Sequence, residues 1–136
     1  MQTFLPYPSF VASAKALDYR RLGKQRVEAR QILKALRSGG GWQNHPAVCM
    51  WRGFEGALVL YSNLMIEEWM NRGYRNTMEI CDPGIVRMPQ WLGDDVFHAS
   101  HRSNLLRKDP NWYGRFGWTE RDDLSYVWPK NMYLGH

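Results

Sequence analysis

The sequence predicts an all-α protein. Apolar residues recur at helical spacing in several long segments, and stretches rich in glycine and proline separate those segments. No segment alternates polar and apolar residues over more than a few positions, which is the pattern typical of β-strands. We therefore expect a compact bundle of three to four main helices, formed as a single domain over residues 1–136 and completed by an irregular aromatic C-terminal segment.

The first two helices are predicted by their caps. Ser9 is positioned to cap a short helix over residues 10–17, and Asp18 is positioned to cap a longer helix over residues 19–37. Three consecutive glycines, at 39–41, end the second helix. Residues 1–8 contain two prolines and are expected to be extended.

The later helices follow similar signals. Asn44-His45-Pro46 predicts a cap with a proline in the first turn, and the helical pattern then continues to residue 72. Gly53 and Gly56 interrupt this pattern and allow a kink or the close approach of another backbone. Residues 74–93 are expected to form an irregular crossover. A further helix is predicted over about 96–108, capped by Asp94 or Asp95. The aromatic residues of the tail that follows are Trp112, Tyr113, Phe116, Trp118, Tyr126, Trp128 and Tyr133.

Composition argues against several classes of protein. With 44% hydrophobic and 14% aromatic residues, the chain is too apolar to be disordered. No run approaches the ~18 apolar residues of a membrane span, and the first residues lack the pattern of a secretion signal. Cys49 and Cys81 have neither metal-ligand spacing nor the density of a disulfide scaffold. We expect a cytoplasmic protein with no metal, no cofactor and no membrane partner.

The positive charge is concentrated in two segments. The whole chain carries 18 Lys and Arg against 13 Asp and Glu, a formal net charge of +5. Residues 15–37 alone carry eight basic and two acidic residues, a net +6, and residues 102–115 carry four basic and one acidic, a net +3. Such an uneven distribution indicates a binding face for a polyanion, although charge alone does not choose between DNA, RNA and acidic lipid.

The helix over 19–37 separates its charged and apolar residues. Its apolar residues fall within one arc of roughly 100°, the width of a stripe that faces a core: they are Leu22, Ala29, Ile32, Leu33 and Leu36. Basic residues fill the opposite arc: Arg20, Lys24, Arg26, Arg30, Lys34 and Arg37.

Glu28 lies on the border between these two arcs. Arg21, Lys24, Gln25 and Glu28 follow one another at i, i+3, i+4 and i+7, and are therefore neighbours on the helix surface. A carboxylate that is half shielded from water and surrounded by cations can act as a general acid or base, or can stabilise positive charge developing on a sugar ring. The competing interpretation is a Lys24–Glu28 surface pair, worth a few tenths of a kcal/mol.

The histidines and the late aromatic residues have two interpretations each. His98 and His101 lie one helical turn apart and form a polar cluster with Arg102 and Asn104, which suits phosphate or base contact but also a buried, hydrogen-bonded histidine. Asn44 and His45 suit either a helix cap or a phosphate site. Trp112-Tyr113 stand among cations, which suits base stacking, and core packing is equally consistent with them.

Three segments carry a family resemblance. Residues 17–28 (LDYRRLGKQRVE), residues 44–47 (NHPA) and residues 97–106 (FHASHRSNLL) resemble bacterial and phage relatives of the pyrimidine dimer DNA glycosylases, the family of the T-even phage endonuclease V. Residues 109–117 resemble the aromatic C-terminal segment of that enzyme. The likeness covers about residues 10–118.

The resemblance implies an all-α domain that binds kinked double-stranded DNA with a base flipped out of the helix. In that family an N-terminal α-amine attacks the sugar C1′, releases a base and forms an imine, and a helix glutamate supports the sugar cation and the later strand cleavage. An α-amino group has an ordinary pKa near ~8, so part of it is neutral and nucleophilic at physiological pH. Two positions differ from the family pattern. Gln2 stands where the family has the reactive threonine, so either the amine belongs to Met1 or the start of the chain is processed differently. Arg21 stands at the position of the family glutamate, which leaves Glu28 as the nearest carboxylate on that side of the helix.

The sequence therefore predicts a glycosylase acting on damaged or modified pyrimidine nucleotides in DNA. The expected catalytic residues are Glu28, Arg21 and Met1. The expected substrate-binding residues are Lys24, Gln25, Asn44, His45, His98, His101 and Asn104. The expected DNA-binding residues are Arg20, Arg26, Arg102, Arg107, Lys108, Trp112 and Tyr113. The alternatives are a DNA-binding module of the same fold without catalysis, and an enzyme acting on a free modified nucleotide.

Overall fold

The computed structural model describes residues 1–129, and helices are its only regular secondary structure, with no strand among these residues. Its elements are α1 (Phe10–Ala16), α2 (Tyr19–Ser38), α3 (Pro46–Cys49), α4 (Glu55–Asn71), α5 (Asp95–Lys108), α6 (Pro110–Tyr113) and a 3₁₀ turn, η1 (Gly114–Phe116). The all-α prediction is confirmed. Tyr133, the last aromatic residue of the predicted tail, lies outside the described residues. None of the described helices combines the length and the apolar character of a membrane-spanning segment.

The helix boundaries follow the predicted signals closely. Ser9 caps α1 by accepting a hydrogen bond from the Ala12 amide at 3.1 Å. His45 caps α3 through its Nδ1 atom, which accepts from the Ala47 amide at 3.0 Å. Asp94 caps α5 in the same way. The expected cap of α2 is different, because the Asp18 side chain contacts Arg21 and the hydroxyl of Tyr113 and makes no capping hydrogen bond.

The predicted helix from Pro46 to residue 72 is two helices, α3 and α4. Gly53 adopts a φ of 87° in the turn between them, a conformation that favours glycine. Gly56, on the first turn of α4, allows the crossover to pass close by: a Cβ at this position would lie 2.2 Å from the carbonyl oxygen of Ile85. The expected close approach of another backbone is found at Gly56. At Gly53 the chain breaks into two helices, where the sequence predicts one helix with at most a kink.

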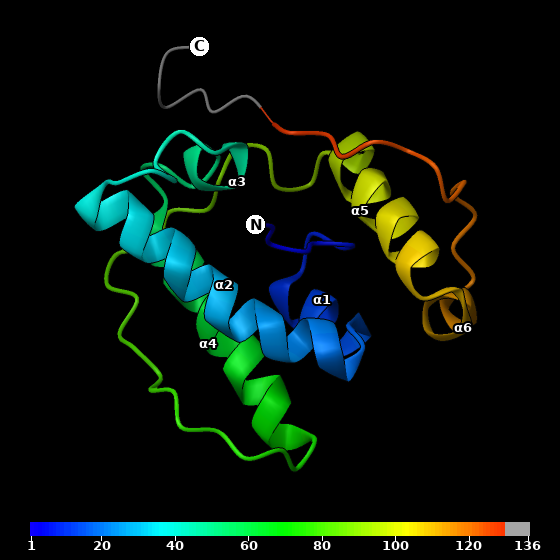
Figure 1. The fold of residues 1–136 in the computed structure, drawn as a ribbon, viewed down its shortest axis with the longest axis horizontal. Helices are drawn as coiled ribbons and strands as arrows, with labels where there is room; N and C mark the ends of the chain where they lie inside the picture. Colours follow the sequence, from blue (N-terminus) through cyan, green and yellow to red (C-terminus); the bar gives the residue numbers. More distant parts are fainter. Residues whose placement is uncertain (130–136) are drawn as a thin grey trace.

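Helix α2 packs chiefly against α4, and α1 also packs against α4 (Figure 1). Leu22, Ala29, Ile32 and Leu33 of the predicted stripe are buried, and Leu36 is half-buried. The opposite, basic arc is only partly solvated. The Arg26 guanidinium lies 4.3 Å from the Trp69 ring and donates to Asn76, and Arg30 donates to Ser62 and to the Glu79 carbonyl. These two arginines therefore hold the irregular crossover over residues 74–93 against α2.

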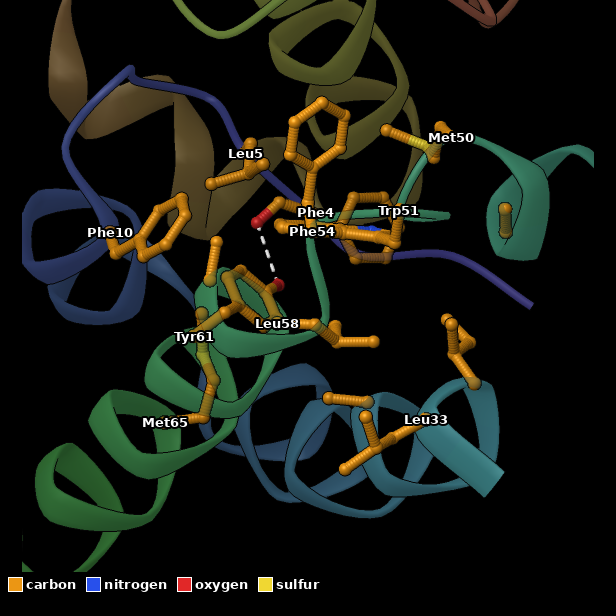
Figure 2. Close-up of a cluster of buried hydrophobic side chains, with 14 of the residues drawn as sticks. Phe4, Leu5, Phe10, Leu33, Met50, Trp51, Phe54, Leu58, Tyr61 and Met65 are labelled. Carbon is orange, nitrogen blue, oxygen red and sulfur yellow. Dashed lines mark hydrogen bonds between the residues drawn. The ribbon is translucent and has the colours of Figure 1, made fainter. Parts of the chain in front are cut away.

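Residues 2–6 pass through the middle of the molecule instead of lying on its surface. The N-terminus lies between the α2–α4 pair and α5 (Figure 1), and Thr3, Phe4 and Leu5 are buried. Figure 2 shows Phe4 and Leu5 among the large core side chains, with the Tyr61 hydroxyl of α4 donating to the Phe4 carbonyl at 2.8 Å. The extended conformation was expected from the prolines, but the burial was not.

The described end of the chain returns along α5 (Figure 1). The amides of Leu124 and Val127 donate to the hydroxyls of Ser103 and Ser100 on that helix. Asn104 completes the contact by donating to the Leu124 carbonyl at 3.0 Å. This segment places Tyr126 beside Phe4, with ring centroids 6.3 Å apart, and Trp128 beside Tyr126 and His45.

Candidate active site

A pocket of about 410 Å³ opens where four parts of the chain meet: the N-terminal segment, the first half of α2, the end of α5 and the returning C-terminal segment. Its lining consists of Met1, Gln2, Phe4, Arg20, Arg21, Lys24, Gln25, Glu28, Lys108 and Tyr126. Seven of these ten are residues that the sequence predicts as catalytic, substrate-binding or DNA-binding. Gln2, Phe4 and Tyr126 were not predicted, and no pattern in the sequence singles them out.

Glu28 is held by three groups at the wall of this pocket. Its Oε2 atom accepts from the backbone amide of Gln2 at 3.2 Å and from Nε2 of Gln25 at 3.2 Å. Its Oε1 atom lies 3.5 Å from Nζ of Lys24. The Glu28 side chain is only 13% exposed, whereas that of Lys24 is 72% exposed. The Lys24–Glu28 ion pair of the competing interpretation is therefore present, but its carboxylate is mostly shielded from water and hydrogen-bonded to the Gln2 amide.

Gln25 connects the N-terminal segment to the carboxylate. Its side chain is buried, and its Oε1 atom accepts from the Phe4 amide at 2.9 Å. The same Oε1 atom lies 2.7 Å from the Tyr61 hydroxyl, whose single proton it shares with the Phe4 carbonyl. Because Phe4 N–H can only donate, Oε1 must face it, and Nε2 is then directed at Glu28. Burial is the main cause that raises the pKa of Tyr61 well above its ordinary value, with the Glu28 charge adding to it, so Tyr61 remains a donor at physiological pH.

Cations surround this carboxylate. Arg20, Arg21, Lys24 and Lys108 line the pocket, and Glu28 is its one acidic residue. Arg21 also pairs with Asp18 at 3.2 Å. Burial lowers the pKa of Lys108, and repulsion from Arg21, Arg107 and Lys24 lowers it further. A pocket with four cationic side chains and one carboxylate is electrostatically suited to an anionic substrate that carries phosphate groups.

The histidines of α5 are not at this pocket. His98 and His101 are buried and hold the backbone of Leu5 from both sides: Nδ1 of His98 donates to the Leu5 carbonyl at 2.8 Å, and Nδ1 of His101 accepts from the Leu5 amide at 2.9 Å. Burial lowers the pKa of both rings, that of His101 to about 3, so both are neutral at pH 7. Asn104 is buried as well and bonds to the C-terminal segment. The structure thus assigns these three side chains to the support of the two chain ends.

Four other residues that the sequence predicts as binding residues do not line this pocket: Arg102, Arg107, Asn44 and His45. Arg102 bonds to Glu120, Asp95 and the Pro6 carbonyl, and Arg107 bonds to Asn104 and the Asp122 carbonyl. Asn44 is exposed in the loop before α3. His45 caps α3, and its pKa is lowered by burial and by the positive α-amino group of Met1. His45 therefore lies close enough to the N-terminus for the charge of the α-amino group to affect its pKa.

Trp112 and Tyr113, the two aromatic residues that the sequence predicts as DNA-binding, lie in different environments. Tyr113 is fully buried, bonded to Asp18 and stacked on Trp118 at 5.7 Å, which is a core position. Trp112 is half-buried and lines a second hollow, of about 500 Å³, with Arg115 stacked on its ring at 3.8 Å. That hollow shares Arg20 with the first pocket, so of the pair only Trp112 lies near a basic surface.

No group of three or more His, Cys, Asp or Glu side chains gathers as metal ligands would within the part of the chain that the structure describes. The fold and the pocket define a small helical protein that presents one shielded carboxylate within a ring of cations, next to the start of its chain.

The chain belongs to the pyrimidine dimer DNA glycosylase family, whose model matches residues 1–82, more than half of the sequence. Neither a curated protein nor a solved structure matches it. The match contains α1 to α4 and the segments around residues 17–28 and 44–47 that carried the resemblance. The segments at 97–106 and 109–117 lie beyond it, and their resemblance, like the assignment to a bacterial and phage branch, stays a prediction. Membership indicates a DNA-repair glycosylase at the level of the family, with DNA as its partner.

Proposed function

We propose that this protein is a DNA glycosylase acting at the sugar C1′ of a damaged or modified pyrimidine nucleotide. The observation that carries the proposal is the position of Glu28, whose shielded carboxylate meets the backbone of Gln2 at the wall of a cationic pocket. A pocket of about 410 Å³ has room for a single extruded nucleotide. The family to which the chain belongs supports the same reaction class.

In this proposal Glu28 acts on the sugar. Breaking the bond between C1′ and the base leaves positive charge on the sugar ring, and a carboxylate fixed in a poorly hydrated position stabilises that charge without having to reorganise. Gln25 and the Gln2 amide fix one carboxylate oxygen, and Lys24 lies beside the other. Arg20, Arg21 and Lys108 then bind the phosphates on either side of the target nucleotide.

The α-amine of Met1 is the proposed nucleophile. Its lone pair forms a bond to C1′ while the electron pair of the bond to the base departs with the base, which takes up a proton. The amine then loses one proton. Its lone pair forms the C=N bond while the bond between C1′ and the ring oxygen breaks, its electron pair stays on the oxygen, and the remaining N–H proton passes to that oxygen, which yields an imine and a hydroxyl group. Met1 lines the pocket, and the next residue in the chain contacts Glu28.

The test uses ultraviolet-irradiated duplex and duplex containing an abasic site, each incubated with the protein and borohydride. Base release and a trapped adduct on the Met1 amine, located by mass spectrometry of the digested product, support the proposal. Acetylation of that amine should abolish trapping. An adduct located on Lys24 or Lys108 would exclude Met1 as the nucleophile.

Two variants test the carboxylate. Glu28→Gln keeps the shape of the side chain and is expected to lower the rate of base release by about 10²-fold or more. Glu67→Gln, on the exposed face of α4, is the matched control and should leave the rate unchanged. Full activity of Glu28→Gln would contradict the role of Glu28. Salt-sensitive binding without base release or trapping would favour the DNA-binding module instead, and affinity for a mononucleotide without affinity for duplex would favour the free-nucleotide enzyme.

A further inference from the structure

A third hollow adjoins the candidate active site beside the glycine loop, which consists of Gly39, Gly40 and Gly41. It has a volume of about 570 Å³ and lies between the end of α2 and residues 39–42. Met1 lines both this hollow and the pocket that contains Glu28, so the two cavities meet at the N-terminus. Trp42 forms one wall and is 57% exposed, unlike the buried or half-buried Trp51, Trp69 and Trp91.

A row of aromatic rings connects the two cavities. The centroid of the Trp42 ring lies 5.7 Å from that of His45, and the His45 ring lies 5.9 Å from that of Trp128. Trp128 is in turn 5.8 Å from Tyr126, which lines the pocket of Glu28. The rings therefore extend from one hollow to the other, and the last of them, Trp42, is the one that is open to solvent.

The glycine loop contributes three residues without side chains to the lining of this hollow. Gly39 and Gly40 have φ values of 73° and 99°, which favour glycine. Gly41 has no such requirement, and a Cβ built on it would meet no atom within 4 Å. The fold therefore accepts a side chain at Gly41, and its absence leaves bare backbone next to Trp42. Lys34 lines the same hollow and contributes a positive charge.

We propose that Trp42 is a stacking site for the nucleobase next to the target nucleotide in the same DNA strand. This rests on the proposed function, because it assumes that a nucleotide occupies the adjoining pocket. Extrusion of one nucleotide deprives its neighbour of a stacking partner, and an aromatic side chain replaces that partner. The occupant is identified as a nucleobase of a charged strand by three features: an exposed ring, a lysine at the same hollow, and continuity with a cationic pocket through Met1.

The experiment measures binding to two duplexes, one fully paired and one with a central tetrahydrofuran analogue of an abasic site, which cannot react by base release. Replacing Trp42 by alanine or leucine is expected to weaken binding to the analogue duplex by roughly 5- to 150-fold, the range for loss of one stacked base. Trp42→Phe should retain most of the affinity because it keeps an aromatic face.

Two readouts separate stacking from other roles. The slope of log affinity against log salt should be the same in wild type and Trp42→Ala, because no phosphate contact is lost. Circular dichroism checks that each variant is folded. Equal binding by Trp42→Leu and Trp42→Phe, or equal losses on both duplexes, would overturn the assignment to an unstacked base.

The inference and the proposed function fail in different ways. If the wild-type protein releases bases and Trp42→Ala binds the analogue duplex as tightly as the wild type, the inference alone is overturned. A wild-type protein that binds neither duplex overturns both.

Discussion

The backbone amide of Gln2 lies 3.2 Å from Oε2 of Glu28, so the second residue of the chain contacts a carboxylate two turns into α2. This contact depends on Gln25, which holds both the carboxylate and the Phe4 amide. The distance between the chain start and the carboxylate is therefore fixed by one buried amide side chain. Four predictions follow from this arrangement and from the packing around it.

Gln25→Leu should destabilise the protein and free the N-terminal segment. The change leaves the Phe4 amide buried without its acceptor, which costs about 1–3 kcal/mol, and the Tyr61 hydroxyl loses one partner as well. Urea unfolding measures the stability, and hydrogen exchange at the Phe4 amide reports the local opening. Gln31→Leu, at an exposed position of the same helix, is the matched control and should change stability by less than about 0.5 kcal/mol. Unchanged protection of Phe4 in Gln25→Leu would contradict the bridging role.

The free energy of unfolding should fall as the pH falls below about 6.5. Histidine titrates near 6.5 in an unfolded chain, whereas burial lowers the pKa of His101 to about 3 in the folded protein. Between these values the unfolded state binds a proton that the folded state does not, so this histidine lowers stability by up to about 1.4 kcal/mol per pH unit. Above pH 6.5 its contribution is constant. His98, whose pKa is also lowered by burial, acts in the same direction.

Urea unfolding between pH 4.5 and 7.5 measures this dependence. His101→Gln should be less stable at pH 7.5, where the ring contacts of wild type are intact, and should show a shallower dependence below pH 6.5. A variant that lost stability in parallel with wild type across the acid range would show that another group causes the slope.

Lys108→Ala should weaken DNA binding and lower the salt dependence. Lys108 comes from the end of α5 and faces the basic residues of α2 across the pocket. If it contacts a phosphate, its removal reduces the slope of log affinity against log salt by about one. Arg87→Ala removes an exposed cation from the crossover and is the control, with the slope expected to stay as in wild type. Equal slopes for all three proteins would place Lys108 outside the DNA-binding surface.

Gly56→Ala should destabilise the fold, whereas Gly41→Ala should not. The added methyl at position 56 would lie 2.2 Å from the Ile85 carbonyl oxygen and 2.8 Å from that of Pro83, so the crossover has to move. Overpacking of this kind costs about 1–3 kcal/mol. Position 41 has open space around it and no unusual φ. Thermal unfolding of both variants checks the contrast, and similar midpoints would mean that the crossover adjusts freely.

The sequence predicts the local features of the site because they belong to one helix. Arg21, Lys24, Gln25 and Glu28 are placed relative to one another by the 3.6-residue period of α2, and the structure finds all four at one pocket. The position of Glu28 between the apolar and basic arcs also predicts its partial burial, which is observed. No contact outside the helix is needed for these conclusions.

The sequence does not predict what depends on distant partners. His98 and His101 share one face of α5, as their spacing requires, but that face is covered by Leu5, which is more than ninety residues away in the chain. Arg26 and Arg30 lie on the basic arc, yet the crossover covers them. Periodicity identifies the faces of a helix and does not state which segment will cover each face.

The hydrogen bonds of His98 and His101 with the Leu5 backbone also bear on the order in which the molecule folds. Leu5 leaves the ribosome early, but its two histidine partners are synthesised only when α5 is made. Until then the Leu5 backbone lacks its two histidine partners, and contacts so distant in sequence slow the search for the native state. We therefore expect the cavity around Glu28, which is lined by this N-terminal segment and by Lys108 of α5, to be complete only once α5 has folded onto the segment.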